Sequence, residues 1–163
     1  MGSFNRDGVK RRLVEVLTHA LGEQWDVSYE WPGDTAGDRW LYFDAATSGD
    51  ATVDTLKVAP GSKRLSSDTF QFQGLLCVQG LDSAEEAEQL AADGLRTVDD
   101  TLRRLTRLRD DTGAIPDGDT AAYAGIQSAH ISRVEGPAAT APQVDDVLID
   151  GMCLLTITCT SQL

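Results

Sequence analysis

The chain is poor in basic residues. Its 163 residues include 14 Lys and Arg against 26 Asp and Glu, which gives a formal net charge of −12. Proteins that wrap nucleic acid through phosphate contacts need clustered Lys and Arg, so this balance argues against that class. It does not exclude DNA that passes by without being bound. The hydrophobic content of 41% is ordinary for a globular protein, and the length predicts a single domain over residues 1–163.

Soft metal ligands are equally scarce. No CxxC pair occurs, and the two histidines are far apart in the sequence. A zinc site needs closely grouped Cys and His ligands, so we predict no metal and no cofactor. The three cysteines, each in an apolar stretch, predict reduced thiols in the core at Cys77, Cys153 and Cys159.

Long apolar runs are absent as well. No run of 18 apolar residues occurs, and the N-terminus lacks the hydrophobic region of a signal peptide. These two features predict a soluble protein that is made in a cytoplasm and has no membrane partner.

The common motifs of catalysis are missing. The sequence contains no P-loop, GxGxxG, GxSxG or HExxH motif. The four aspartates of "DDTGAIPDGDT", among them Asp117 and Asp119, lack the spacing and the terminal Glu of an EF-hand calcium loop. A solvated acidic loop accounts for them, and we predict no catalytic residue and no enzymatic activity.

Two amphipathic helices are present. Apolar residues recur every three to four positions over 6–22 and again over 83–109, so each segment carries one apolar stripe. Ser83 followed by Glu86 is a capping box. The acidic first turns and basic last turns of 83–109 match the helix dipole, so its charges have a structural explanation.

Alternating patterns predict the strands. In residues 25–31, "WDVSYEW", every second residue is apolar, which predicts a half-buried strand with Trp25, Val27, Tyr29 and Trp31 toward the core. Further strands are predicted at about 39–46, 69–79, 122–134 and 149–161. One face of 69–79 turns from polar to apolar along the chain, which indicates a sheet covered on both sides at that end.

Two connecting segments have an unusual composition. Residues 47–67 are rich in Ser, Thr, Gly and Asp, and we predict a long loop or an extended hairpin that protrudes from the domain. Its basic residues are Lys57, Lys63 and Arg64. Residues 136–146 form a Pro/Ala-rich connection with little to anchor it.

These elements together predict the fold class. Two helices packed on a mainly antiparallel sheet of four to five strands form an α+β fold, a two-layer sandwich. The predicted order of elements is α-β-β-β-α-β-β, with the long loop or hairpin before the third strand.

The stretch "YEWPGD", 29–34, allows two interpretations. Trp31 and Asp34 would face a ligand if the stretch were a binding loop. Alternatively Pro32 and Gly33 end the preceding strand, because Pro cannot donate to a strand ladder and Gly permits a positive φ. We favour the second interpretation, which leaves Asp34 on a turn.

Four stretches in chain order carry a resemblance to a known family: "VSYEWPGD" after the first helix, the aromatic "WLYFD", the basic-to-apolar "SKRLSSDTFQFQGLLCV", and the helical "GLDSAEEAEQLAADGLRTVDDTLR". The pattern resembles the tail-terminator or tail-completion proteins of long-tailed (siphovirus-type) phages, especially those that infect actinobacteria. It covers roughly residues 8–163. The longer segment 47–67 and the connection 136–146 depart from the family, so loop contacts are the least transferable part.

The resemblance implies a virion structural protein that forms a ring, typically a hexamer. Such a ring caps the head-proximal end of the tail tube, stops its polymerisation and joins the tail to the head–tail connector proteins. Genomic DNA passes through the lumen without specific binding. On this basis we predict interface residues in three segments, 57–64, the turn 32–38 and the loop 110–121: Lys57, Lys63, Arg64, Pro32, Gly33, Asp34, Asp117 and Asp119.

Two alternatives stay open. The chain could be a neighbouring part of the same machine, either a head–tail connector or a tube subunit. A tube subunit would polymerise into long tubes when purified, whereas a terminator would stop at rings. The other alternative is a small ligand-binding or hydrolytic α+β domain that uses Trp31, Asp34, His130 and the acidic loop, and it requires these groups to meet in one pocket.

Overall fold

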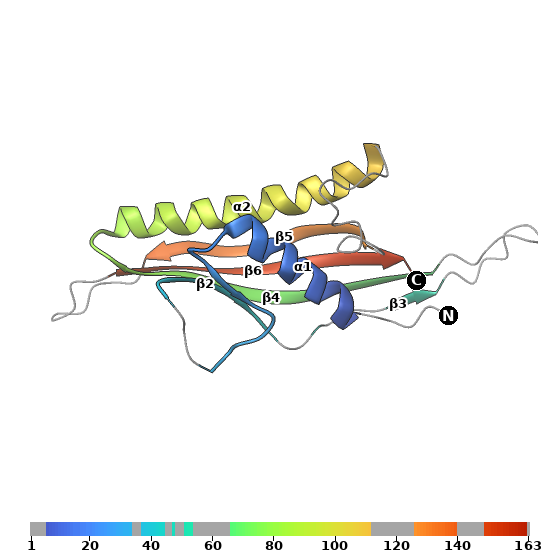
Figure 1. The fold of residues 1–163 in the computed structure, drawn as a ribbon, viewed down its shortest axis with the longest axis horizontal. Coiled ribbons are helices and arrows are strands. Elements are labelled where there is room, and N and C mark those ends of the chain that lie inside the picture. Colours follow the sequence, from blue (N-terminus) through green and yellow to red (C-terminus); the bar gives the residue numbers. More distant parts are fainter. Residues whose placement is uncertain are drawn as a thin grey trace, which may run out of the picture.

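The computed structural model describes residues 6–33, 37–44, 47, 51–53, 66–111, 126–139 and 149–162. Its elements are α1 (Arg6–Leu21), β1 (Asp26–Ser28), β2 (Arg39–Phe43), β3 (Ala51–Val53), β4 (Ser66–Leu81), α2 (Ala84–Asp111), β5 (Ile126–Ala139) and β6 (Ile149–Gln162). Figure 1 shows the long helix α2 running along the sheet, and the shorter helix α1 in front of the sheet.

The strands form one mixed sheet. Their order is β1-β2-β4-β6-β5, and β3 pairs with the start of β4. β1 runs parallel to β2, while the other pairs are antiparallel. The predicted α+β class, a mainly antiparallel sheet with two helices packed on it, is confirmed. The sheet has six strands, whereas four to five were predicted. The additional strand is the three-residue β3, which lies within the segment 47–67 that was predicted as a long loop or an extended hairpin.

Local signals in the sequence account for the helix ends. α1 stops before Gly22, whose φ of +87° is a left-handed conformation that favours glycine. The Glu86 amide donates to Ser83 Oγ at 3.1 Å, which confirms the N-terminal half of the predicted capping box at α2.

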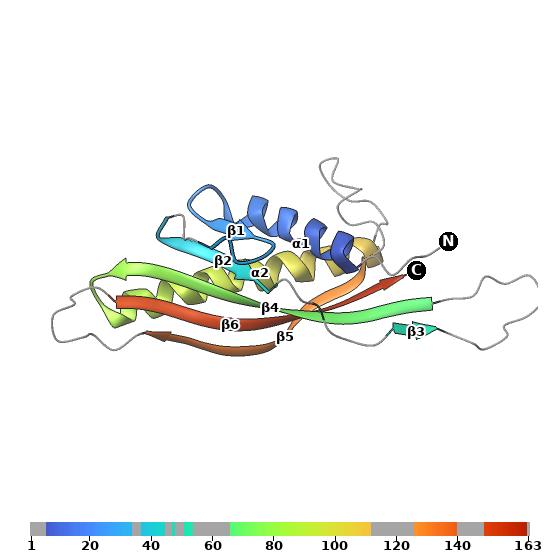
Figure 2. The ribbon, with the colours of Figure 1, turned by 90° about the horizontal axis from the view of Figure 1, so that it is seen from below.

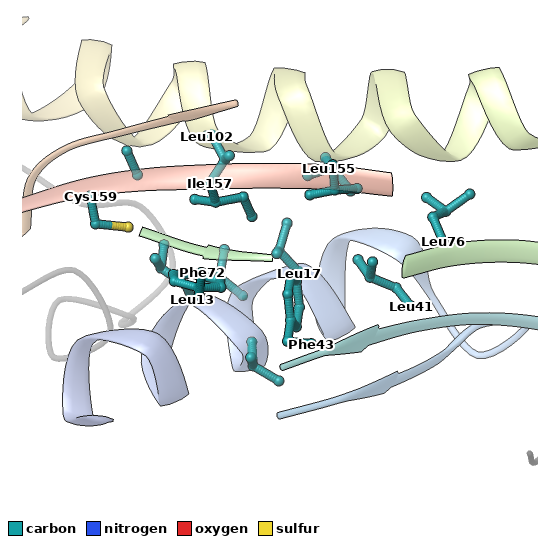
Figure 3. Packing of buried hydrophobic residues seen from close by; sticks show 14 of the residues in the cluster. Leu13, Leu17, Leu41, Phe43, Phe72, Leu76, Leu102, Leu155, Ile157 and Cys159 are labelled. Carbon is teal, nitrogen blue, oxygen red and sulfur yellow. The ribbon is translucent and has the colours of Figure 1, made fainter. Parts of the chain in front are cut away.

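The core lies between the two helices and one face of the sheet. Leu13 and Leu17 of α1 and Leu102 of α2 are fully buried, and Figure 3 shows them around Phe72 and Ile157 of the sheet. Other buried sheet residues in this cluster are Leu41, Phe43, Phe70, Leu76, Val78, Cys153, Leu155 and Cys159. Burial of these apolar side chains is the main force that holds the helices on the sheet.

Small residues let α2 approach the sheet closely. A Cβ added to Gly151 of β6 would lie 2.3 Å from the Ala87 carbonyl oxygen of α2. A Cβ added to Gly94 of α2 would lie 2.6 Å from the Trp25 ring. The helix backbone therefore sits against β6 and the Trp25 indole at positions where no larger residue fits.

Several strand boundaries differ from the predictions: β2 ends at Phe43 rather than near 46, and β4 spans Ser66–Leu81 rather than 69–79. β1 ends at Ser28, so the alternating stretch 25–31 is only partly a strand. β5 continues to Ala139, so the first four residues of the predicted connection 136–146 belong to a strand. The register of β5 and β6 shifts between Glu135 and Ala138, and such a bulge on an edge strand accommodates a proline.

Candidate protein-interaction face

The face of the sheet opposite the core, called the outer face from here on, is turned to the viewer in Figure 2. Within the described part of the chain no helix covers this face, because α1 and α2 both pack into the core on the other side. Directly paired residues of neighbouring strands share a face, so the register defines the outer face row by row.

One half of the outer face is apolar. Two rows of paired residues cross β1, β2, β4, β6 and β5 there: Asp26, Trp40, Cys77, Met152 and Ala138 in the first, and Ser28, Tyr42, Leu75, Leu154 and Glu135 in the second. Trp40, Tyr42 and Cys77 are buried, and Leu75 and Met152 are half-buried against them. We call six residues of this area the outer patch: Trp31, Trp40, Tyr42, Leu75, Cys77 and Met152.

Trp31 lies across two aromatic rings of the outer patch. Trp40 and Tyr42 are stacked with ring centroids 4.6 Å apart. The Trp31 ring stands perpendicular to both, with centroid distances of 5.4 Å to Trp40 and 5.1 Å to Tyr42. Edge-to-face contacts of this kind add about 0.5–1.5 kcal/mol each beyond burial, yet 52% of the Trp31 surface stays exposed.

The prediction that Trp31 points to the core is wrong. Trp25, Val27 and Tyr29 do pack against the core, as predicted. Because β1 ends at Ser28, the chain bends at 29–30 and the two-residue alternation does not extend to Trp31.

The other half of the outer face is polar. Thr69 and Thr160 share a hydrogen bond of 3.1 Å between their hydroxyls, and Thr158 Oγ1 donates to Ser132 Oγ at 2.8 Å. His130 is paired with Thr158 in this half and is exposed. The change from polar to apolar along β4 is the pattern that the sequence of 69–79 predicts.

Carboxylates flank the outer patch. The Tyr42 hydroxyl donates to Asp26 Oδ2 at 2.5 Å, which holds the carboxylate beside the aromatic rings. Asp150 accepts a hydrogen bond from the Gly80 amide at 3.1 Å, and its charge adds to burial in raising the pKa of the Cys77 thiol to about 12. The patch is therefore apolar at its centre and acidic at its border.

Trp40 carries a buried polar atom that lacks a partner. Its side chain is 3% exposed, and Nε1 has no hydrogen-bond acceptor among the residues that the structure describes. An unsatisfied buried donor costs about 1–3 kcal/mol, and native proteins contain few of them. The indole N–H therefore marks a position where an acceptor from outside the described residues would be favourable.

A second unusual group, Lys10, lies inside the molecule. Its ammonium donates to the Asp44 carbonyl oxygen and lies 3.9 Å from the centroid of the Tyr29 ring. Burial lowers the pKa of Lys10, while nearby carboxylates, first Asp44, act in the opposite direction. Its hydrogen bond to Asp44 ties α1 to the end of β2. Because Lys10 is fully buried, a substrate cannot reach its ammonium group.

The start of α1 is tied to the sheet by an ion pair. Arg6 Nε and a second guanidinium nitrogen donate to the two oxygens of Asp68 at 2.7 and 2.8 Å. The Asp68 side chain is 1% exposed and that of Arg6 is 22% exposed. This bidentate pair is structural, because it satisfies a carboxylate that would otherwise be buried without a partner.

The cysteines are poor nucleophiles. Cys77, Cys153 and Cys159 are free and buried, in line with the predicted reduced core thiols. Burial raises the pKa of all three thiols, to about 12 for Cys77 and Cys159. The thiolate is the reactive form, so these residues remain protonated at neutral pH.

The predicted interface residues are mostly outside the described residues. This applies to Lys57, Lys63, Arg64, Asp34, Asp117 and Asp119. Pro32 and Gly33 are described: both are exposed, and Gly33 has the positive φ expected of the turn, +87°. The two residues follow Trp31 directly and thus lie at the border of the outer patch.

The structure separates Trp31 from His130, the two described groups that a ligand-binding domain would use, while Asp34 and most of the acidic loop lie outside the described residues. Trp31 lies over Tyr42 on β2, whereas His130 is on β5, three strands away and four residues further along the sheet. Standard strand dimensions place them about 19 Å apart.

Two features of the site could have been predicted from the sequence, namely the burial of Lys10 and the outer-face position of Trp40 and Tyr42. Lys10 has the helical spacing of Leu13 and Leu17, which predicts a position on the buried stripe of α1. The strand "RWLYF" is apolar on both faces, which is typical of a strand covered on both sides and points to Trp40 and Tyr42 as outer-face residues. The position of Trp31 had no such signal, because it depends on where β1 ends.

Comparisons with known proteins add no family assignment. No protein-family model matches the chain, and no curated protein matches it either. Within the described ranges, no three His, Cys, Asp or Glu side chains are grouped closely enough to hold a metal ion. Neither described helix has the length and apolar character needed to cross a bilayer.

Proposed function

We propose that this protein is a structural subunit of a phage virion, a tail terminator that forms a ring at the head-proximal end of the tail tube. The proposal rests on the sequence resemblance, on the α+β fold that the resemblance implies, and on the outer patch. In this role the protein stops tube polymerisation and joins the tail to the head–tail connector proteins. The ring is a homo-oligomer, typically a hexamer, and the protein has no catalytic role.

The outer patch is the observation that carries the proposal. The half-exposed Trp31 lies against Trp40 and Tyr42, and half-buried Leu75 and Met152 pack against the same cluster, on a sheet face that neither described helix covers. Aromatic and Met side chains are enriched in the cores of protein–protein interfaces, where charged residues form the rim. An apolar patch with an acidic border on an open sheet therefore favours an assembly protein over a monomeric one.

The net charge is consistent with a DNA conduit. Each subunit carries a formal charge of −12, so a ring of several subunits is strongly negative as a whole. Carboxylates that line the lumen would repel the phosphates of passing DNA and prevent it from binding. A map of charge on the assembled ring tests this point, and a basic lumen would contradict it.

Negative-stain electron microscopy of the purified protein, alone and mixed with tail tubes, tests the proposed function. We expect rings alone or rings at one end of each tube, with bare tubes as the control. Long filaments of the purified protein would identify a tube subunit instead. Tube ends that stay bare at saturating protein would contradict the terminator role.

A further inference from the structure

We propose that the outer patch of one subunit binds the basic segment 54–65 of a second copy of this chain. This inference rests on the proposed function, since it names the contact that would join neighbouring subunits of the ring. It is carried by three observations: the composition of the two surfaces, the distance between them, and the unpartnered donor of Trp40.

The two surfaces have matching chemistry. Segment 54–65, "DTLKVAPGSKRL", contains Lys57, Lys63 and Arg64 among apolar residues and has one acidic residue. The stretch 22–44, which supplies Trp31, Trp40 and Tyr42, contains six acidic residues and a single basic one. A segment that is apolar and basic therefore complements a patch that is apolar at its centre and acidic at its border.

Some of the other basic side chains are engaged within the subunit. Arg6, Arg96, Arg103 and Arg133 form ion pairs within the subunit. Lys10 is buried. The segment 54–65 offers three further cations within twelve residues, and exposed arginines also lie on α1 and α2, at Arg11, Arg12 and Arg104.

A subunit cannot place this segment on its own patch. β3 ends at Val53, which is paired with Ser66 at the start of β4, so both ends of the segment are anchored at one end of the sheet. Its twelve residues reach at most about 20 Å from that point when doubled back on themselves. The nearest patch residue on β4 is Leu75, nine residues and about 30 Å further along the strand.

The contact must therefore form between copies, and two arrangements of the copies satisfy it. Figure 2 shows β3 at one end of the sheet and β1 and β2 toward the other. A patch and a segment at opposite ends of a subunit can be joined in two ways. In a head-to-tail arrangement each copy binds the next one, which gives a closed ring when the rotation between copies closes, whereas in a two-fold dimer each copy's segment lies on the other's patch and assembly stops at two copies. The ring of the proposed function requires the head-to-tail arrangement.

The unpartnered donor of Trp40 fits an extended segment. A peptide backbone supplies carbonyl oxygens, and Nε1 of Trp40 lacks an acceptor within the described residues. Trp31 lies against Trp40 with more than half of its surface exposed, so a bound segment that contacts Trp31 also lies next to the Trp40 ring. The lysine and arginine side chains then reach the carboxylates at the border, such as Asp26.

A peptide titration tests the recognition itself. The receptor is the full chain with Lys57, Lys63 and Arg64 all changed to Glu, so that its own copies do not compete, and the probe is a synthetic peptide of residues 54–65. We expect a change in tryptophan fluorescence on binding that weakens as salt is added. Adding Trp31→Ala to this receptor should weaken binding at least tenfold. Absence of binding at millimolar peptide, or equal binding without Trp31, would overturn the inference.

Asp26→Asn is a second variant that keeps the fold. The amide retains an oxygen acceptor for the Tyr42 hydroxyl but removes the charge, so peptide binding should weaken severalfold. Glu15→Gln, an exposed neutralisation on α1, is the matched control and should bind the peptide like the parent. Equal binding by both variants would exclude the acidic border from the contact.

A mixing experiment tests whether patch and segment come from different copies, and the mass of the wild-type assembly, more than two copies for a head-to-tail contact and two for a reciprocal two-fold contact, distinguishes the two arrangements. We expect Trp31→Ala and the triple Glu variant each to be monomeric by native mass spectrometry. Mixed together they should form a heterodimer and stop there, because only one intact patch and one intact segment remain. Reversing three exposed arginines instead, Arg11, Arg12 and Arg104, gives the matched charge control and should leave assembly intact.

The outcomes also separate this inference from the proposed function. Rings that persist at tube ends in the Trp31→Ala variant would leave the terminator role standing and overturn the patch–segment contact. Bare tube ends with the wild-type protein, together with specific peptide binding, would overturn the terminator role and leave the contact standing.

Discussion

The ion pair between Arg6 and Asp68 should be among the most sensitive points of the fold. Replacing Arg6 by Met keeps much of the aliphatic length but leaves the Asp68 carboxylate, 1% exposed, without its bidentate partner. Removing one member of a buried pair costs about 3–5 kcal/mol. For a domain of this size that corresponds to a fall in melting temperature of roughly 6–20 °C.

Urea unfolding followed by circular dichroism at pH 7 measures this loss. Arg96→Met is the matched control, because the Arg96–Asp93 pair is more than half exposed on both sides and such pairs contribute at most about 1 kcal/mol. The double variant Arg6→Met/Asp68→Leu should recover most of the loss, since it removes the buried charge together with its partner. If Arg6→Met costs no more than Arg96→Met, the buried pair is not what ties α1 to the sheet.

Three further predictions concern the core and the outer patch. Gly151→Ala should lower the free energy of unfolding by about 1–3 kcal/mol or more, because its Cβ would meet the Ala87 carbonyl oxygen at 2.3 Å; urea unfolding checks this. The Cys159 thiol has a pKa raised to about 12 by burial, so the folded state keeps a proton that the unfolded state releases. Stability should therefore fall as pH rises above 9, by up to about 1.4 kcal/mol per pH unit for this thiol, and the pH profile of Cys159→Ala should be correspondingly flatter. Trp40→Phe should cost the monomer less than about 2 kcal/mol, because the removed N–H has no acceptor within the described residues, and should weaken binding of the 54–65 peptide; unfolding and titration of one preparation measure both.

Much of the fold could be predicted from local patterns. The stripes of α1 and α2, the capping contact at Ser83 and the two faces of β4 each depend on side-chain periods of 3.6 or 2 residues, which are visible without tertiary information. The end of β1 and the extension of β5 were predicted less well. Strand ends depend on pairing partners that are distant in the sequence, such as Trp40 for Asp26 and Met152 for Ala138.

The α+β class, the acidic charge, the two amphipathic helices and the buried cysteines could be predicted without tertiary information, because each follows from composition or from short-range periodicity. Tertiary structure decided where Trp31 lies, since the bend after Ser28 carries it from the expected core face to the outer face against Trp40 and Tyr42. Tertiary structure also decided that the outer patch and the anchors of segment 54–65 lie at opposite ends of one long strand, β4. Strand pairing brings β2 to one end of β4 and β3 to the other, and because of that separation the proposed contact forms between two copies rather than within one.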